Sequence, residues 1–267
     1  MLVNRQSPTM KTAFAISPDR TRIAYDVTGT GPVLMLLHGG FQTRRVWHDL
    51  GYVDRLRARF TVAAVDLRGN GESDKPTSAE AYSIDRLCED LLAVADAVGA
   101  RRFTIWGFSY GANVGRYLAA RSDRVDAMVM MGIPFGAATS GPFRQLILDL
   151  RTKWVPVLQA ERAGNFDPNT LPEADRADWQ RGTVPLNIAW LSALLEWPPV
   201  EPRDLRCRSL WLVGSDNDAA MESVRRYEGS LTGTAVTLVV VPGLTHEDEV
   251  VKLEQVLPRL EQFTVGR

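Results

Sequence analysis

The most constraining stretch of this sequence is a serine held between two glycines, where one hydrophobic pattern gives way to another. The apolar, β-forming residues 103–106 end at Gly107, and a helical apolar spacing begins after Ser109. Ser109 therefore occupies a sharp turn from a strand into a helix. Gly107 and Gly111 lack a Cβ, which lets the strand and the helix approach closely. We expect the hydroxyl to project beyond the strand, at the positive end of the helix.

Apolar strands and amphipathic helices alternate along the rest of the chain. Continuous apolar runs, which suit strands covered on both faces, occur at 33–37, 61–65, 103–106, 125–131, 209–213 and 236–241. Helical spacing occurs at 46–60, 84–98, 110–121, 219–231 and 247–263. A predicted β-hairpin at 12–25 precedes them. This alternation predicts an α/β fold with a mostly parallel sheet and helices on both faces.

Length and composition narrow the class of protein. The chain has 267 residues, of which 45% are hydrophobic, and its formal net charge is −1 with no basic stripe. We therefore expect no nucleic-acid partner, and no run approaches the ~18 apolar residues that span a membrane. Residues 1–11 lack the apolar core of a signal peptide, so we expect a cytoplasmic protein, with Met10 as an alternative start. Cys88 and Cys207 are expected to be free and buried. The sequence does not indicate an oligomeric state.

The regular alternation stops at about residue 134 and resumes at about residue 205. The interrupting stretch is rich in proline and holds four of the seven tryptophans, which is too aromatic for a linker. Its spacing predicts short helices at 143–158 and 186–197. We therefore predict that residues 1–133 and 205–267 form the α/β core and that residues 134–204 are an insertion.

Residues able to do chemistry follow several of the predicted strands. The carboxyl ends of parallel strands lie at one edge of a sheet, so these residues should meet on one rim. They are His38, Asp66, Ser109, Asp216, Asp218 and His246.

A serine hydroxyl needs a general base before it can act as a nucleophile. The chain has three histidines. His48 lies in a predicted helix that the sheet should carry away from the serine. His38 precedes two glycines and is expected to shape that turn, with a base role as the less favoured alternative. His246, in the loop after the last strand, can reach back over the sheet to Ser109, and we predict that it is the base.

The remaining parts of such a site are a carboxylate for the histidine and donors for a developing negative charge. The loop after residue 213 offers Asp218, which we favour, and Asp216 as the alternative. Asp66 is expected to pair with Arg68 instead. A developing oxyanion needs two backbone N–H donors. We expect one from Tyr110 and the other from the loop after His38.

In that loop, Gly40 or Phe41 is the expected second donor. The order Ser109, Asp218, His246 is the nucleophile-acid-base order of the α/β-hydrolase fold, which the sequence resembles over nearly its whole length. The motifs that carry the resemblance are His38-Gly39-Gly40-Phe41, Asp66-x-Arg68-Gly69-x-Gly71-x-Ser73, Gly107-Phe108-Ser109-Tyr110-Gly111 and Pro242-Gly243-Leu244-Thr245-His246.

The sequence departs from the family pattern in three places. Asn70 and Thr245 stand where histidine and glycine are usual. The family's Gly-x-x-Asp acid motif would put the acid at Asn217, and a loop one residue longer restores it at Asp218. The acid is therefore left open between Asp218 and Asp216.

The resemblance implies a serine hydrolase of carboxylesterase or lactonase type acting on a small, largely apolar ester or lactone, without cofactor or metal. Serine at the turn argues against the related haloalkane dehalogenases and epoxide hydrolases, which use aspartate there. The resemblance also implies that residues 134–204 form a cap over the site. Residues expected to line an apolar pocket there, or else to form the cap's own core, are Trp154, Trp179, Trp190, Phe143 and Leu194.

Other activities use the same set of groups. Hydrolysis of a carbon–carbon bond, amide cleavage, peracid formation and acyl transfer need the same residues, and a lyase could use them for acid–base chemistry alone. A non-hydrolytic protein that binds a ligand while keeping the fold is the alternative from a different class.

Overall fold

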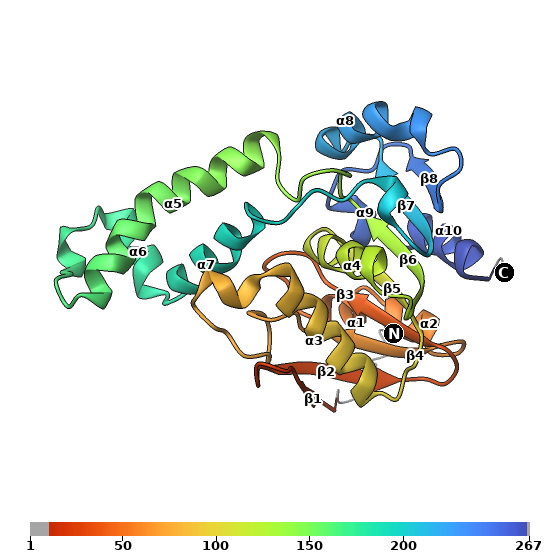
Figure 1. The fold of residues 1–267 in the computed structure, drawn as a ribbon, viewed down its shortest axis with the longest axis horizontal. Helices are drawn as coiled ribbons and strands as arrows, with labels where there is room; N and C mark the ends of the chain where they lie inside the picture. Colours follow the sequence, from red (N-terminus) through yellow and green to blue (C-terminus); the bar gives the residue numbers. More distant parts are fainter. Residues whose placement is uncertain (1–10, 266–267) are drawn as a thin grey trace, which may run out of the picture.

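The computed structural model describes residues 11–265. The predictions about a signal peptide and an alternative start fall mainly on residues 1–10, outside the described residues. Within the described part, eight strands form one sheet in the order β1-β2-β4-β3-β5-β6-β7-β8 (Figure 1). Their bounds are β1 Ala13–Ile16, β2 Arg22–Thr28, β3 Val33–Leu37, β4 Thr61–Val65, β5 Phe103–Phe108, β6 Val125–Met131, β7 Arg208–Gly214 and β8 Val236–Val241.

The sheet is parallel from β4 to β8, and the amino-terminal hairpin pairs with it antiparallel through β2. The α-helices are α1 Arg45–Asp49, α2 Tyr52–Leu56, α3 Ile84–Ala97, α4 Tyr110–Arg121, α5 Gly141–Arg162, α6 Glu173–Gln180, α7 Val184–Leu194, α8 Asp218–Tyr227, α9 Asp248–Val251 and α10 Leu253–Val265. Short 3₁₀ helices are η1 Ala79–Tyr82, η2 Pro168–Thr170, η3 Pro202–Asp204 and η4 Glu228–Ser230. The predicted α/β architecture is confirmed.

Two hydrophobic cores lie on opposite faces of the sheet. Along β3, Leu34 and Leu36 pack in the core covered by α1, α2 and α10. Their neighbours Met35 and Leu37 pack in the core covered by α3, α4 and α8. Successive side chains of a strand point to opposite faces, so a strand buried on both sides must be apolar throughout. This explains the uninterrupted apolar runs of the sequence.

Two helices that the spacing predicts as continuous are each broken. The helix expected at 46–60 divides into α1 and α2 at Gly51, whose φ of 83° is left-handed. The helix expected at 247–263 divides at Lys252 into α9 and α10. Both pieces of each pair pack on the same core, so the apolar spacing continues across the break. Hydrophobic spacing alone could not reveal these breaks.

Residues 134–204, which we call the cap segment, leave the sheet after β6 and return to it at β7. They form α5, α6 and α7, of which α5 and α6 extend away from the sheet (Figure 1). Trp154, Leu158, Val184 and Ile188 form a small core of their own within this segment.

A short neck joins the cap segment to the rest of the molecule. Gly136 on the outgoing chain pairs with Val200 on the returning chain as an antiparallel bridge. Arg116 of α4 is fully buried and donates to the carbonyl oxygens of Pro134 at 2.7 Å and Gly136 at 3.2 Å. The next residue of α4, Tyr117, donates its hydroxyl to a carbonyl on the returning chain. The neck is therefore held by the helix that begins directly after Ser109.

No helix within residues 11–265 has both the length and the apolar character needed to cross a bilayer. Cys88 and Cys207 are free and buried, as expected from the sequence. Burial raises the pKa of the Cys88 thiol to about 12.

Candidate active site

Ser109 occupies the sharp turn between β5 and α4. Its φ of 49° is in the left-handed region, which a residue with a side chain adopts only under strain. The turn is fixed by its neighbours, because the Ser109 N–H donates to the Met131 carbonyl at 2.9 Å and the Gly111 N–H donates to the His38 carbonyl at 3.0 Å. A Cβ at Gly107 or Gly111 would lie within 3.0 Å of backbone atoms. Both glycines are therefore required by space.

His246 reaches Ser109 from the loop after β8. Its Nε2 lies 3.1 Å from Ser109 Oγ, which is hydrogen-bond distance. The imidazole stacks on Phe108 with ring centroids 4.9 Å apart, and its side chain is 47% exposed. The structure thus brings together the serine and the histidine that the sequence pairs, in a place open to a ligand.

The other two histidines are committed elsewhere. His38 is fully buried, with Nδ1 2.7 Å from the Gly39 carbonyl oxygen, and its Nε2 accepts the Leu67 N–H at 3.1 Å. Nδ1 therefore carries the proton, and burial lowers the pKa of His38, which keeps the ring neutral. His48 Nε2 lies 3.0 Å from Asp26. Neither is placed to deprotonate Ser109.

Buried neutral His38 gives the free energy of unfolding a pH dependence. In the unfolded chain His38 takes up a proton below about pH 6.5, whereas in the folded chain its pKa is lowered. Its contribution is complete above that pH and is lost as the pH falls below it, by up to about 1.4 kcal/mol per pH unit. Urea titrations at pH 7.5 and 5.5 should therefore show a smaller loss of stability in His38→Asn than in the wild type. Equal losses would contradict this assignment.

Three backbone N–H groups are available beside Ser109. Those of Gly40, Phe41 and Tyr110 have no acceptor among residues 11–265. Phe41 has a φ of 60°. Three described non-glycine residues have a positive φ, and two of them, Phe41 and Ser109, lie at this site. Strained backbone concentrates where it orients groups for function. The arrangement fits the predicted pair of oxyanion donors, one from Tyr110 and one from Gly40 or Phe41.

A buried ion pair holds the loop that carries Gly40 and Phe41. Arg44 donates its backbone N–H to Asp66 at 2.7 Å, pairs with the same carboxylate through its guanidinium, and donates to Asp26 at 3.0 Å. The predicted partner of Asp66, Arg68, pairs with Asp90 instead. Proximity in the sequence misled here, because Asp66 pairs with Arg44 at the start of α1 whereas Arg68 pairs with Asp90 of α3.

The two aspartates predicted to support His246 do not reach it. Asp218 is the first residue of α8 and is exposed, and its carboxylate has no hydrogen bond or ion pair to any described residue. Asp216 is exposed and accepts a hydrogen bond from Ser215 at 2.8 Å. Only the residue between them turns inward: Asn217 Nδ2 lies 3.3 Å from His246 Nδ1. The preference for Asp218, with Asp216 as alternative, is therefore not met by the geometry.

A carboxylate that was not predicted from the sequence lies against His246. Glu249 of α9 places Oε2 3.2 Å from His246 Nδ1 and is completely buried. A carboxylate only accepts hydrogen bonds, so Nδ1 carries the proton and Nε2 is left to accept one from Ser109. The available signal was the spacing His246-x-x-Glu249, since residues three apart on a helical turn share a face.

The five residues proposed to line a pocket have different positions. Trp190 lies at the site, with its ring centroid 5.1 Å from the rings of Phe41 and of Tyr110. Trp154 and Trp179 stack on each other in the core of the cap segment. Leu194 is buried in the core covered by α3, α4 and α8, and Phe143 is exposed on α5. Only Trp190 has contacts that support a lining role.

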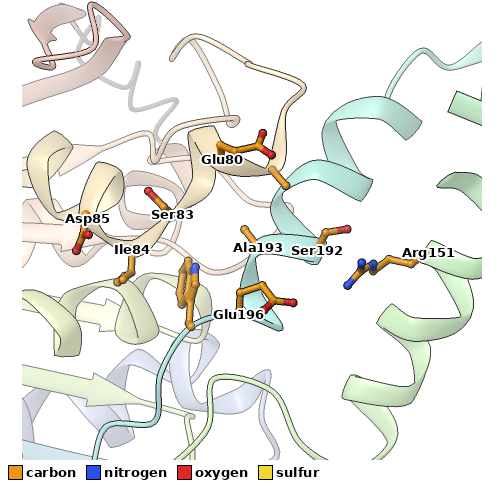
Figure 2. Close-up of a pocket in the computed structure, with 10 residues that line it drawn as sticks. Glu80, Ser83, Ile84, Asp85, Arg151, Ser192, Ala193 and Glu196 are labelled. Atoms are coloured by element: carbon orange, nitrogen blue, oxygen red, sulfur yellow. The ribbon is translucent and has the colours of Figure 1, made fainter. Parts of the chain in front are cut away.

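A hollow lies between the cap segment and the core. It has a volume of about 320 Å³ and lies between η1, the start of α3, α5 and α7. In Figure 2, Arg151 extends from α5 toward Ser192 and Glu196 of the opposite wall. Trp197 lines this hollow and also stacks on Tyr110, at 6.0 Å between ring centroids. The residues that line it do not include Ser109 or His246, so it is separate from the candidate site.

Comparison with known proteins bears on the fold. A family model described as alpha/beta hydrolase fold matches residues 32–175. Over 109 residues the chain is 35% identical to Epoxide hydrolase 3 of Siraitia grosvenorii, a match that covers 40% of this chain and 34% of that protein. The chain therefore matches only about a third of the length of this curated relative.

Solved structures resemble the chain over almost its full length. One is from a study of novel epoxide hydrolases in metagenomes from hot environments, with a TM-score of 0.74 and 21% identity over 97% of this chain and 100% of that one. Another is the esterase RhEst1 from Rhodococcus sp. ECU1013, with a TM-score of 0.70 and 24% identity over 96% of this chain and 99% of that one. At such identities the likeness shows the fold alone.

Proposed function

The chain belongs to the alpha/beta hydrolase fold family, and from this premise we propose that it is a serine hydrolase that cleaves a small, largely apolar carboxylic ester or lactone. The observation that carries the proposal is the Ser109–His246 pair at 3.1 Å beside three unpaired backbone N–H groups. A nucleophile, a base and oxyanion donors are the groups that acyl transfer needs.

The mechanism follows from the placement of these groups. Ser109 Oγ attacks the carbonyl carbon while His246 Nε2 takes its proton. The N–H groups of Tyr110 and of Gly40 or Phe41 donate to the carbonyl oxygen as it gains negative charge. The ester C–O bond then breaks, and His246 gives its proton to the departing alcohol oxygen. Water, deprotonated by His246, cleaves the acyl-enzyme and releases the acid.

Serine at position 109 favours ester chemistry over the epoxide chemistry named for the curated relative. Attack of a carboxylate on an epoxide forms an ester, which water can hydrolyse to release the enzyme. Attack of a serine oxygen on an epoxide would form an ether, which has no carbonyl for water to attack. Ser109 can therefore turn over an acyl substrate but not an epoxide by covalent catalysis.

Aromatic rings around the oxyanion loop support an apolar substrate. Phe41 is 68% exposed, and its ring meets Trp190 edge-on. A Cβ built on Gly40 would lie 3.4 Å from Trp190, so the cap segment packs against the predicted oxyanion donor. An acyl chain or alcohol group bound there would pack on these rings and lose contact with water.

A fluorophosphonate and an ester series together test the proposal. We expect wild-type protein to form one covalent adduct, located at Ser109 by peptide mass spectrometry, because a serine beside its base attacks phosphorus as it attacks a carbonyl. We expect turnover of p-nitrophenyl esters and of aliphatic lactones, with highest kcat/KM for apolar acyl groups. No adduct and no turnover would instead favour a ligand-binding protein, and a preference for charged acyl groups would contradict the substrate class.

A further inference from the structure

The most unusual feature of the candidate site is the residue at the position of the acid. The end of β7 and the loop after it read Gly214-Ser215-Asp216-Asn217, so an amide stands where the family's pattern has a carboxylate. Asn217 is buried, whereas Asp216 and Asp218 on either side of it are exposed. The loop thus keeps the inward-facing position of the acid but not its charge.

The contacts of Asn217 define which end of its amide faces the site. Its Oδ1 accepts the Ala220 N–H at 3.3 Å and caps the start of α8. Its Nδ2 is therefore the inward group, 3.0 Å and 3.2 Å from the two oxygens of Glu249. An N–H donor cannot hold the Nδ1 proton of His246, but it can hold a carboxylate that does.

Glu249 receives three donors, two from the end of β7 and the loop after it and one from the loop after β8. His246 Nδ1 lies 3.2 Å from Oε2, Asn217 donates from the β7 loop, and the Gly214 N–H donates to Oε1 at 2.6 Å. A fully buried carboxylate is costly unless its oxygens are paired, and charge-assisted hydrogen bonds of this kind offset that cost. The donors orient Glu249 so that one oxygen faces the imidazole.

The end of β6 is shaped to admit this side chain. Gly132 follows β6 directly and has a left-handed φ of 74°. A Cβ there would lie within 3.0 Å of Glu249 Oε2 and of His246 Nδ1. The space that holds the carboxylate exists because position 132 has no side chain.

We propose that the triad carboxylate has moved from the loop after β7 to Glu249 of α9, three residues after the histidine, and that Asn217 has become the amide that holds it. The proposal rests on the serine hydrolase function inferred above. Glu249 is a positioning residue: it fixes the ring of His246 with Nε2 toward Ser109 and stabilises the imidazolium formed when Ser109 attacks.

A swap of the two positions tests the proposal. Glu249→Gln keeps shape but removes the charge, and we expect kcat for p-nitrophenyl butyrate to fall on the order of 10³- to 10⁴-fold with little change in KM. Asn217→Asp with Glu249→Gln returns a carboxylate to within reach of Nδ1, since Asn217 Nδ2 already lies 3.3 Å from it. We expect this double variant to recover at least about tenfold of the lost kcat.

Asp218→Asn is the matched control, because it neutralises a carboxylate of the same loop that makes no contact with His246. We expect its kcat to stay within about twofold of the wild type. A larger loss in Asp218→Asn than in Glu249→Gln would overturn the proposal. So would failure of the double variant to recover activity while its thermal midpoint matches that of Glu249→Gln, since Glu249 would then be structural.

Proton NMR gives a readout that does not depend on turnover. A downfield resonance from the proton on His246 Nδ1, identified by its absence in His246→Gln, should persist in Asp218→Asn and be lost or shifted upfield in Glu249→Gln. Should Glu249→Gln fail to fold, loss of the resonance in Asp218→Asn would still refute the proposal and its persistence would support it. Wild-type protein that shows the resonance but forms no fluorophosphonate adduct would refute the hydrolase function and leave the carboxylate assignment standing.

Discussion

Replacing Ser109 or His246 by alanine is expected to lower kcat for ester hydrolysis by roughly 10⁴- to 10⁶-fold, and replacing both should cost no more than replacing one. In the proposed mechanism the two side chains act as a unit, because the proton would pass across the 3.1 Å contact between Oγ and Nε2. Removing either partner removes that transfer. Steady-state kinetics on p-nitrophenyl butyrate, with active protein quantified by mass, would measure the effect.

His48→Gln is a matched control for the histidine. His48 contacts Asp26 and has no hydrogen bond to Ser109. Its replacement should leave kcat within a few-fold of the wild type. Losses that multiply in the Ser109→Ala, His246→Ala double variant would mean that the two residues act independently, which would argue against a shared proton transfer.

The largest expected effect on stability is at Gly111. Because Gly111 has no side chain, the start of α4 can pack closely against the backbone at the end of β3. A Cβ there would lie within 3.0 Å of the carbonyl oxygens of Leu37 and His38, which are backbone atoms that cannot rotate away. We expect Gly111→Ala to lower the free energy of unfolding by about 3 kcal/mol, the upper end for overpacking, or to prevent folding.

Gly229→Ala is the control for this substitution. A Cβ at Gly229 meets no atom within 4 Å, and its φ is not in the left-handed region. Its replacement should leave stability unchanged or raise it by up to about 1 kcal/mol, since alanine has fewer unfolded conformations. Urea titrations of both variants would decide the matter. Equal stability of the two would show that the turn after β5 can open without cost.

The sheet and the turn at Ser109 were predictable because the information for them is local. A strand covered on both faces is apolar throughout, and the glycines beside Ser109 sit next to it in the sequence. His246 could be found by elimination among three histidines. The family model and the solved structures confirm the fold that these patterns predict.

The carboxylate beside His246 was not predictable by the same means. The family pattern directs attention to the loop after β7, where two exposed aspartates flank an inward asparagine. What decides the matter is which of three adjacent residues turns inward, and that depends on where α8 begins. Glu249 could not be distinguished from the neighbouring acidic residues, because the sequence there predicts an amphipathic helix with charged residues on its exposed face.

The two alternatives for the pocket residues, lining a pocket or forming the cap's own core, could not be separated from the sequence for a different reason. Tryptophans of the cap segment have no periodic pattern that separates its own core from the face over the site. Trp154 and Trp179 stack on each other, whereas Trp190 meets Phe41. Only contacts between distant segments distinguish these roles.

The neck of the cap segment restricts how that segment can move relative to Ser109. Arg116 holds the outgoing chain through two carbonyl oxygens, and Tyr117 holds the returning chain beside it. Swinging the whole cap would strip a fully buried guanidinium of these acceptors, which is costly. The neck is thus a stiff pivot anchored on the nucleophile's own helix. If the protein acts as the proposed hydrolase, we expect entry and product release to require movement beyond the neck, so that the rate of exchange is separable from the alignment of Ser109 and His246.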